Sequence, residues 1–239
     1  MSLTVERSTP NHTSVPVPDI SLLRLLQLVT PALPVGAFNF SQGLEYAVHM
    51  RWVEDEASAL AWIQGLAKFA VGTLDLPLLL RMHRGWREND PEGVRRWSAK
   101  LIAARESAEA RAEDRHMGQA LAKILSELEI EAARAWVAND AATFATLFSL
   151  AAQRWGIDTE EMTAGYLWAW SENQVLAAIK LVPLGQTAGQ RMLDHLVQQI
   201  PAIVARAADM RDEDIGTSAP AQGMAIALHE TQYSRLFRS

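Results

Sequence analysis

The stretch that decides the fold is TEEMTAGYLWAWSENQVLAAIKLVPLGQTAGQ, residues 159–190. From Met162 to Val182 it has too few polar positions to form a solvated stripe. A helix that is apolar on nearly every side is normally buried, because no face of it prefers water. The pattern therefore predicts a buried central helix over residues 159–182.

Residues that start and stop helices mark both ends of this helix. Asp158 can cap the first turn, and Glu161 three positions later completes the pattern of a capping box. Pro183 lacks the N–H that a continuing helix needs, and Gly185 tolerates left-handed dihedrals. The sequence TAGQ at 187–190 is a second capping-box pattern, which predicts the start of another helix.

Lys180 is the most informative charge in the chain, because it lies on an otherwise apolar helix. A Lys in such a place needs a partner or a route to water. It can extend from the last turn to solvent and complement the helix dipole there, which the residue pattern favours, or it can belong to a functional polar site. Small residues at steps of four also predict close approach of a neighbouring helix. They are Gly165, Ala169, Asn173 and Ala177.

The rest of the chain shows helical periodicity and no alternating β pattern. The predicted fold class is all-α, a single-domain orthogonal or bundle-like array of about eight to ten helices around the central one. Residues 1–18 have the composition of a flexible tail, and residues 19–210 form the helical domain. In residues 211–239, Met224 and Leu228 give only a weak apolar stripe. This segment must therefore order against its own domain or against another chain.

Two further segments have clear local signals. Residues 30–45, TPALPVGAFNFSQGLE, combine Pro, Gly and capping residues, which indicates a shaped loop rather than a flexible one. A helix is predicted over residues 54–72, and a second helix from Asp75, with Pro77 in its first turn. We therefore expect a break between these two helices.

A run of alternating charges occupies the segment between Leu101 and Leu128. Within it, Arg105 and Glu109 are four residues apart, and Asp114 follows Arg111 by three, so both pairs can meet on a helix. Runs of this kind usually form a solvated helix face. We expect that here as well.

Composition excludes several function classes. The 239 residues include no cysteine, which rules out disulfides, thiolate catalysis, iron–sulfur clusters and zinc sites built on Cys. The formal charge is -6 and no Lys/Arg cluster occurs, so a nucleic-acid partner is not expected. Neither a membrane-spanning run nor a signal pattern is present, so we expect a cytoplasmic protein without a membrane partner.

The six histidines offer little for catalysis, since no two have the spacing of a helical metal pair. Glu45 and His49 lie four apart and could form an acid/base pair or a modest metal site. His229-Glu230 starts like HExxH, but Tyr233 stands where the second ligand should be. The alternative function is thus a helical metal-assisted hydrolase using one of these pairs, and a third is a small-molecule binder with a Trp-rich pocket. Residue chemistry alone favours an interaction protein.

Four segments together resemble the UreF family of urease accessory proteins. The resemblance runs in order from Leu22 to Ser239, and its C-terminal part is the most specific. The chain departs from the family pattern at Asn39-Phe40 and at Leu184, which leaves the implied function intact. The segments are LPVGAFNFSQGLE (33–45), RESAEARAEDRHMG (105–118), AAIKLVPLGQTAGQ (177–190) and HETQYSRLFRS (229–239).

The resemblance implies a non-catalytic helical protein that helps to insert nickel into the urease apoprotein. Family members form a homodimer, bind the accessory protein UreD, also called UreH, and recruit the nickel-carrying GTPase UreG, whose activity they are proposed to gate. With no Cys and no paired His, no cofactor and no tight nickel site are expected in this chain. Any nickel in transit would be guided by position or by a water-filled passage.

The resemblance also assigns residues to two surfaces. Tyr233 and Arg235 would lie in a tail that becomes ordered when UreD binds and completes the docking platform. The aromatic and Arg content of this tail is typical of a binding hot spot. The residues carried over by motif to the UreG-facing surface are Lys180, Pro183, Gly185 and Gln186, with Glu45 as a weaker candidate.

Overall fold

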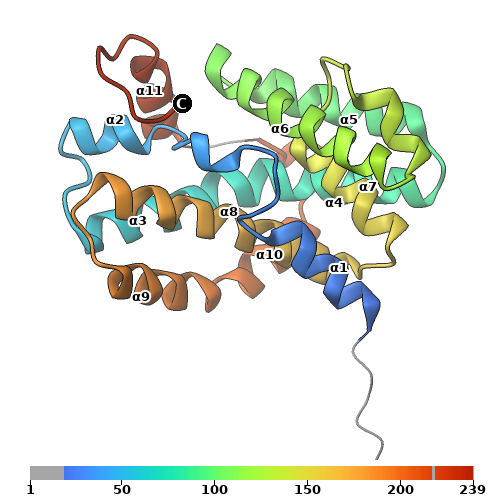
Figure 1. Ribbon diagram of the computed structural model, residues 1–239, viewed down its shortest axis with the longest axis horizontal. Coiled ribbons are helices and arrows are strands. Elements are labelled where there is room, and N and C mark those ends of the chain that lie inside the picture. The colour runs from blue at the N-terminus through green and yellow to red at the C-terminus, as the bar shows by residue number, and fades with distance from the viewer. Residues whose placement is uncertain (1–18, 217–218, 239) are drawn as a thin grey trace, which may run out of the picture.

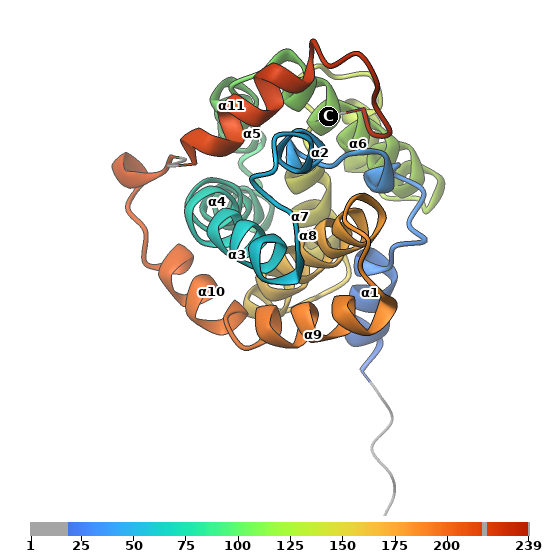
Figure 2. The same ribbon diagram turned by 90° about the vertical axis from the view of Figure 1, so that its left-hand side faces the viewer.

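The computed structural model describes residues 19–216 and 219–238. Every regular element in these ranges is a helix, which confirms the all-α class, and the helices pack around α8 (Figures 1 and 2). The tail predicted for residues 1–18 lies outside the described part. The α-helices are α1 (Ile20–Val29), α2 (Leu44–His49), α3 (Glu56–Leu66), α4 (Leu76–Arg87), α5 (Pro91–Ala104), α6 (Ala108–Glu127), α7 (Phe144–Arg154), α8 (Thr159–Leu181), α9 (Gln186–Val197), α10 (Ile200–Ala208) and α11 (Pro220–His229).

Helix α8 is the predicted central helix, and its bounds agree with the prediction to within one residue. Its N-terminal half contributes Met162 and Leu167 to the larger of two hydrophobic clusters, and its C-terminal half contributes Val175 and Ala178 to the smaller one. The helix thus joins both parts of the core. This explains why its sequence has no continuous polar face.

The two capping boxes predicted at the ends of α8 are wrong. Asp158 does cap the helix, but it accepts a hydrogen bond from the N–H of Glu160, at 2.8 Å, rather than from that of Glu161. Helix α9 already begins at Gln186, so the TAGQ sequence lies inside it and no side chain caps its start. Gly185 has a φ of -78°, outside the left-handed region. Val182 and Gly185 have extended dihedrals, and α9 begins directly after them, one residue before Thr187.

The small-residue face of α8 admits α1, as predicted. A Cβ atom added at Gly165 would lie 2.7 Å from Leu25 Cδ1, too close for any larger side chain without movement. Ala169 and Asn173, further along the same face, line a cavity beside α1. Small side chains therefore let α1 approach and also leave space next to it.

Helices α3 and α4 are parts of one continuous helix, so the predicted break before Asp75 is wrong. Between them Ala67–Asp75 (η2) forms a π-helix, and Asp75 has helical dihedrals rather than those of a cap. The wider π turn accommodates Pro77, which has no N–H to offer the Thr73 carbonyl. That carbonyl instead accepts a hydrogen bond from the N–H of Gly216, at 3.1 Å. The chain leading to α11 is thereby tied to this helix.

The same continuous helix, Glu56–Arg87, is long and apolar enough to cross a membrane by length and composition alone. However, 72% of its most apolar window is buried inside the fold. Its apolar length therefore reflects its place in the core.

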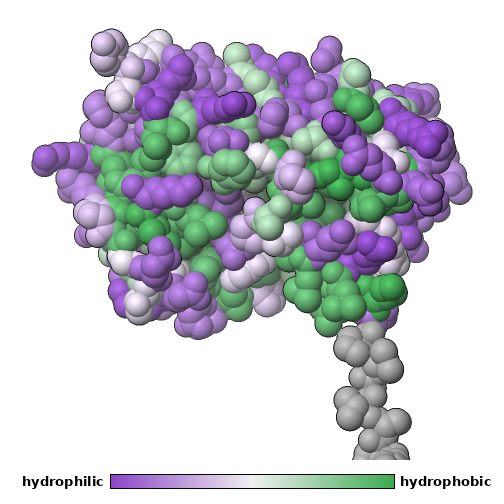
Figure 3. Space-filling view, in the orientation of Figure 1, coloured by the Kyte–Doolittle hydropathy of each residue, from purple (hydrophilic) through white to green (hydrophobic). Residues whose placement is uncertain are grey.

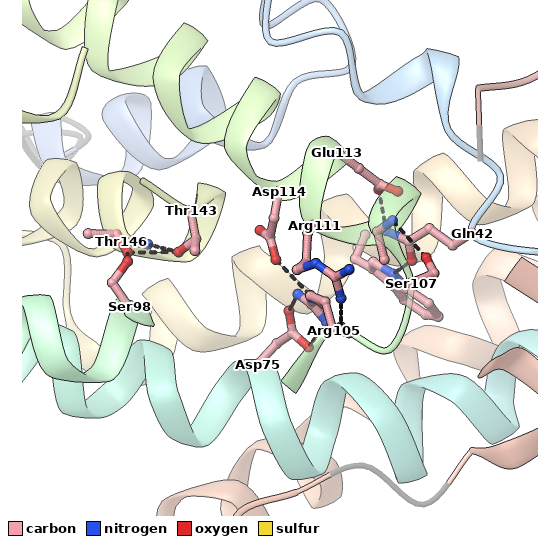
Figure 4. Close-up of polar contacts among 12 residues, drawn as sticks. Gln42, Asp75, Ser98, Arg105, Ser107, Arg111, Glu113, Asp114, Thr143 and Thr146 are labelled. Atoms are coloured by element: carbon pink, nitrogen blue, oxygen red, sulfur yellow. Dashed lines mark hydrogen bonds and ion pairs between the residues drawn. The ribbon is translucent and has the colours of Figure 1, made fainter. Parts of the chain in front are cut away.

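The charged residues before and within α6 form a buried network rather than the predicted solvated face. Arg105 donates hydrogen bonds from Nη2 to Asp75 Oδ1 at 2.5 Å and from Nε to Asp114 Oδ2 at 2.6 Å. Both carboxylates are buried, and Figure 4 shows the guanidinium between them. Arg111, which was expected to pair with Asp114, donates instead to the main-chain carbonyl of Arg105 at 2.8 Å. A buried charge needs such partners, and here they come from two helices.

Burial changes the titration of this network. It raises the pKa of the Asp114 carboxyl, an effect that Arg105 only partly offsets and that the neighbouring Asp75 adds to. Burial next to the Asp75 carboxylate also raises the pKa of the Tyr166 phenol well above its usual value. The Tyr166 O–H points at Asp75 Oδ1, 3.4 Å away. One guanidinium therefore serves two carboxylates, and its loss would leave both without a counter-charge.

Replacing Arg105 with Leu should lower the free energy of unfolding by about 3–5 kcal/mol, because it strands two buried carboxylates. A matched control is Arg95→Leu on α5, which removes an exposed pair with Glu92. That change should cost at most about 1 kcal/mol. Urea unfolding followed by circular dichroism measures both. Equal losses in the two variants would contradict the role given to the network.

Candidate functional site: the C-terminal platform

The C-terminal segment packs against its own domain, which answers the question that the sequence left open. Helix α11 lies beside α2 (Figure 2) and buries Ala225, Ile226 and His229. Gly43, the N-cap of α2, makes this approach possible. A Cβ atom added to it would lie 3.0 Å from Ala225 Cβ and 3.1 Å from Ile226 Cγ1.

His229 is the centre of the contact between α11 and the rest of the domain, and its side chain is fully buried. Its Nε2 lies 3.1 Å from Glu45 Oε2, and its Nδ1 lies 3.1 Å from Glu109 Oε2. Neither pair predicted for acid/base chemistry forms. Glu45 turns to His229 while His49 is exposed on α2, and Glu230 Oε1 accepts a hydrogen bond from the main-chain N–H of Glu109 at 3.3 Å.

The Glu45 carboxylate also holds the other end of the C-terminal segment. Its Oε1 accepts a hydrogen bond from the N–H of Leu236 at 2.6 Å, and its Oε2 accepts one from the N–H of Phe237 at 2.9 Å. One side chain, itself only 8% exposed, thus contacts both ends of the stretch from His229 to Phe237. Between those ends Tyr233 is fully exposed, at 105%.

Phe237 connects this segment to the end of α8. Its ring is buried in the smaller hydrophobic cluster with Ala177 and Val182, and Lys180 Nζ lies 5.7 Å from the ring centroid. A cation at this distance over an aromatic face is attracted by the ring. The exposed Lys180 therefore has a contact with the tail that no spacing in the sequence indicates.

We call the resulting surface the C-terminal platform. It consists of α2, the end of α8 with the turn at residues 182–185, the start of α9, and residues 219–238. Pro183, Gly185 and Gln186 are exposed on the turn and the start of α9. Arg235 lies at the edge, with Nη1 2.5 Å from Glu109 Oε1. All the site residues predicted from the sequence therefore belong to the platform, although Glu45 is buried within it.

No pattern in the sequence indicates a role for Glu109, which contacts the C-terminal segment from α6. The charge pattern predicted a pair with Arg105 four residues earlier, yet the Glu109 carboxylate bonds to His229 and Arg235. These partners are more than a hundred residues away in the chain. Only an alignment of many relatives, or the structure itself, could reveal such a contact.

A cavity of about 160 Å³ lies between α1, η2, α6 and α8, beneath the start of α11. Apolar side chains such as Leu28, Val71 and Trp170 form much of its wall, with Glu113 and Glu172 among the polar ones. Burial raises the pKa of Glu172. The Asp75–Arg105–Asp114 network also borders the cavity. Within the described ranges, no three His, Asp or Glu side chains are arranged to hold one metal ion.

Comparison with known sequences gives a family for this chain. A sequence model of the UreF family matches residues 53–197, more than half of the chain. The chain belongs to the UreF family. The UreF proteins of Alkalilimnicola ehrlichii and Hahella chejuensis, both called urease accessory protein UreF, are 46% and 45% identical to it over 222 and 223 residues. The alignments cover 93% of this chain in both cases, and 97% and 100% of the relatives.

Membership of the UreF family gives this chain a role in urease maturation. The family model covers α8 with the following turn, whereas Glu45 and residues 219–238 lie outside its matched region. The full-length relatives extend over most of the remaining chain. The platform is therefore built partly from the family's central region and partly from the flanking segments that meet it in the fold.

The close contact at Gly43 is testable by adding one methyl group. Gly43→Ala should lower the free energy of unfolding by about 1–2 kcal/mol through its left-handed dihedral, and should additionally loosen α11. Gly156→Ala is the matched control, because Gly156 has a φ of +66° but open space around it. Amide exchange over residues 220–229 should rise only in the Gly43 variant. Equal exchange in both variants would mean that Gly43 does not set the position of α11.

Proposed function

We propose that this chain is a non-catalytic adaptor in urease maturation. It links the complex of UreD and the urease apoprotein to the nickel-carrying GTPase UreG and modulates the GTPase activity. The observation that carries the proposal is the contact between Lys180 and Phe237. This contact joins the C-terminal tail, which the family resemblance links to UreD, to the end of α8, which it links to UreG. Binding of one partner can therefore affect the surface that the other partner contacts.

The platform has the composition of a protein-binding surface. Tyr233 projects into solvent, and Leu228 and Leu236 are exposed near it. Exposed aromatic and apolar side chains next to Lys180 and Arg235 provide the mixture that hot spots favour. We infer that UreD binding fixes the C-terminal segment, and that UreG contacts this segment together with the side formed by the turn after α8.

In this proposal nickel is cargo and not a resident cofactor. The chain guides it by position or through a water-filled passage, because it has no cysteine and its His229 imidazole is already engaged on both nitrogens. We also infer a cytoplasmic location and no nucleic-acid or membrane partner. The formal charge of -6 supports the absence of nucleic acid from its partners.

The alternative function, a metal-assisted hydrolase, has less support. Both oxygens of Glu45 accept hydrogen bonds within the platform, and His49 is not among its partners. Metal content after dialysis distinguishes the two functions. About one tightly held ion per chain would favour the hydrolase, since catalytic sites retain their metal through three protein ligands.

Single substitutions on exposed residues test the adaptor function best. Lys180→Ala and Tyr233→Ala should each weaken UreG recruitment by about 2 kcal/mol, the effect of a hot-spot residue, while UreD binding to Lys180→Ala stays unchanged. Arg235→Ala should also weaken recruitment, but Arg235 contacts Glu109 and so is a less specific probe. The measurement is titration of UreG onto the preformed complex with UreD, with masses checked by light scattering.

The control for these variants is Lys123→Ala, which removes an exposed Lys from α6, away from the platform. Its recruitment of UreG should match that of the wild type. A truncation at Gly216 is a poorer test, because it removes Ile226, His229 and Phe237 from the core. Unchanged recruitment in both platform variants would overturn the assignment of this surface.

We propose further that two copies of the chain associate through α1, giving the homodimer expected for the family. Helix α1 exposes Ile20, Leu22, Leu23 and Leu26, which form an apolar patch at the lower right of Figure 3. Exposed apolar patches of this kind are typical of protein contacts.

Changing Leu23 and Leu26 together to Asp should convert the dimer into a monomer, because it places charges in an apolar contact. Light scattering behind size exclusion measures the mass. Leu128→Asp, which places a charge on an exposed apolar residue outside α1, is the control and should leave the dimer intact. A dimer that persists in the double variant excludes α1 as the contact.

A further inference from the structure

We propose that Glu45 is the positioning residue of the C-terminal platform. Its carboxylate closes residues 230–236 into a loop and sets Phe237 beneath Lys180, so this one side chain controls whether the platform is assembled. The effect of Glu45 on partner recruitment rests on the proposed adaptor function. The loop closure itself does not.

The geometry of the closure is specific to Glu45. Three donors converge on its two oxygens: the His229 ring at the start of the loop and the N–H groups of Leu236 and Phe237 at its end, at 2.6–3.1 Å. Hydrogen bonds to an ionised carboxylate are stronger than neutral ones. The N–H of Glu45 itself is held by the Ser41 hydroxyl at 3.2 Å, which fixes the start of α2. The start of α2, which carries the acceptor, is therefore held by a contact that does not involve the loop.

Charge adds to this geometry. An ionised carboxylate only accepts hydrogen bonds, so His229 can satisfy Glu45 and Glu109 together only when both of its ring nitrogens carry a proton. Arg235 is the other cation facing Glu109, and Glu230 is the remaining carboxylate on the segment. The His229 and Arg235 side chains thus face the Glu45 and Glu109 carboxylates, and Glu230 bonds to the Glu109 main chain. Removing the Glu45 charge would leave the buried His229 ring with a weaker hydrogen-bond partner.

The loop has few other ties to the domain. Gln232 and Thr231 bond within the segment itself, to Ser234 and Leu228. Beyond Glu45, the described contacts that anchor it are those of Glu109 with His229, Glu230 and Arg235, the hydrogen bond from the Arg238 N–H to the Asn39 carbonyl, and the packing of Phe237. Glu109 contacts side chains at both ends of the loop, but only Glu45 accepts hydrogen bonds from the main-chain N–H groups of Leu236 and Phe237. Losing Glu45 should therefore free the whole loop and not only one residue.

The consequence for the platform follows from the position of Phe237. Its N–H bonds to Glu45 and its ring lies under Lys180, so the carboxylate and the Lys act on the same residue from two sides. When the loop opens, Lys180 loses its aromatic neighbour and Tyr233 loses its fixed position. Glu45 is buried, so its own effect on a partner must be transmitted through these two residues.

Amide exchange on the full-length chain tests the closure directly. In the wild type the Leu236 and Phe237 N–H groups should exchange at least about tenfold more slowly than freely solvated amides, since each donates to a buried carboxylate. In Glu45→Gln, which keeps the side-chain volume, their exchange should accelerate by about tenfold or more. The amides of α8 should exchange as before.

Glu109→Gln is the matched control, because it alters the same buried cluster but leaves the acceptors of Leu236 and Phe237 in place. Their exchange in this variant should change by less than about threefold. Equal acceleration in the two variants would overturn the specific role of Glu45. So would unprotected Leu236 and Phe237 amides in the wild type, an outcome that does not depend on any variant folding.

Titration of UreG onto the complex with UreD then separates the two proposals. Loss of recruitment in Glu45→Gln together with faster loop exchange supports both. Faster exchange of the Leu236 and Phe237 amides with full UreG recruitment would support the loop closure by Glu45. It would also show that the loop is not needed for the proposed adaptor function. Lys180→Ala, which leaves the Glu45 hydrogen bonds in place, should reduce recruitment without accelerating the Leu236 and Phe237 amides.

Discussion

Helix α8 has apolar side chains on nearly every side over its 23 residues, and such a helix is stable only when other helices enclose it. Much of the remaining architecture follows from this requirement. Helices α1, α4, α9 and α10 all contact it, and small residues such as Gly165 allow α1 to come close. Because α8 contributes to both hydrophobic clusters, the two ends of the domain are connected through one rigid element.

The packing around α8 also buries charged side chains. These side chains form two clusters in which each one has hydrogen-bond partners. Arg105 is shared by Asp75 and Asp114 within the larger part of the core, where the π-helix helps to bring Asp75 into reach. Glu45 and Glu109 share His229 beneath α11. In both places a buried charge has at least one opposite charge and further hydrogen bonds, which is the condition for keeping ions inside a protein.

These two networks differ in what they connect. The Arg105 network joins elements that are held together by many apolar contacts as well, so it belongs to the stability of the domain. The Glu45 network joins α2 to a terminal segment with a weak apolar stripe, so hydrogen bonds provide a large share of its attachment. A partner that releases the end of such a segment must break these hydrogen bonds and withdraw Phe237 from the smaller hydrophobic cluster, while the larger cluster stays packed. Such an attachment suits a maturation factor of the UreF family.

The sequence by itself determined the all-α class, the existence and bounds of α8, and the membership of a family. These features depend on local periodicity and on residues that start or stop helices, which act over a few positions. Only the tertiary structure decided that α3 and α4 are continuous, that Arg105 pairs with Asp75, and that Glu45 bonds to His229. These contacts join residues from 30 to 184 positions apart, and spacing along a helix carries no information about them. The predicted site residues came from family resemblance, and one of them, Glu45, is a buried carboxylate whose partners are brought to it by the packing of α11.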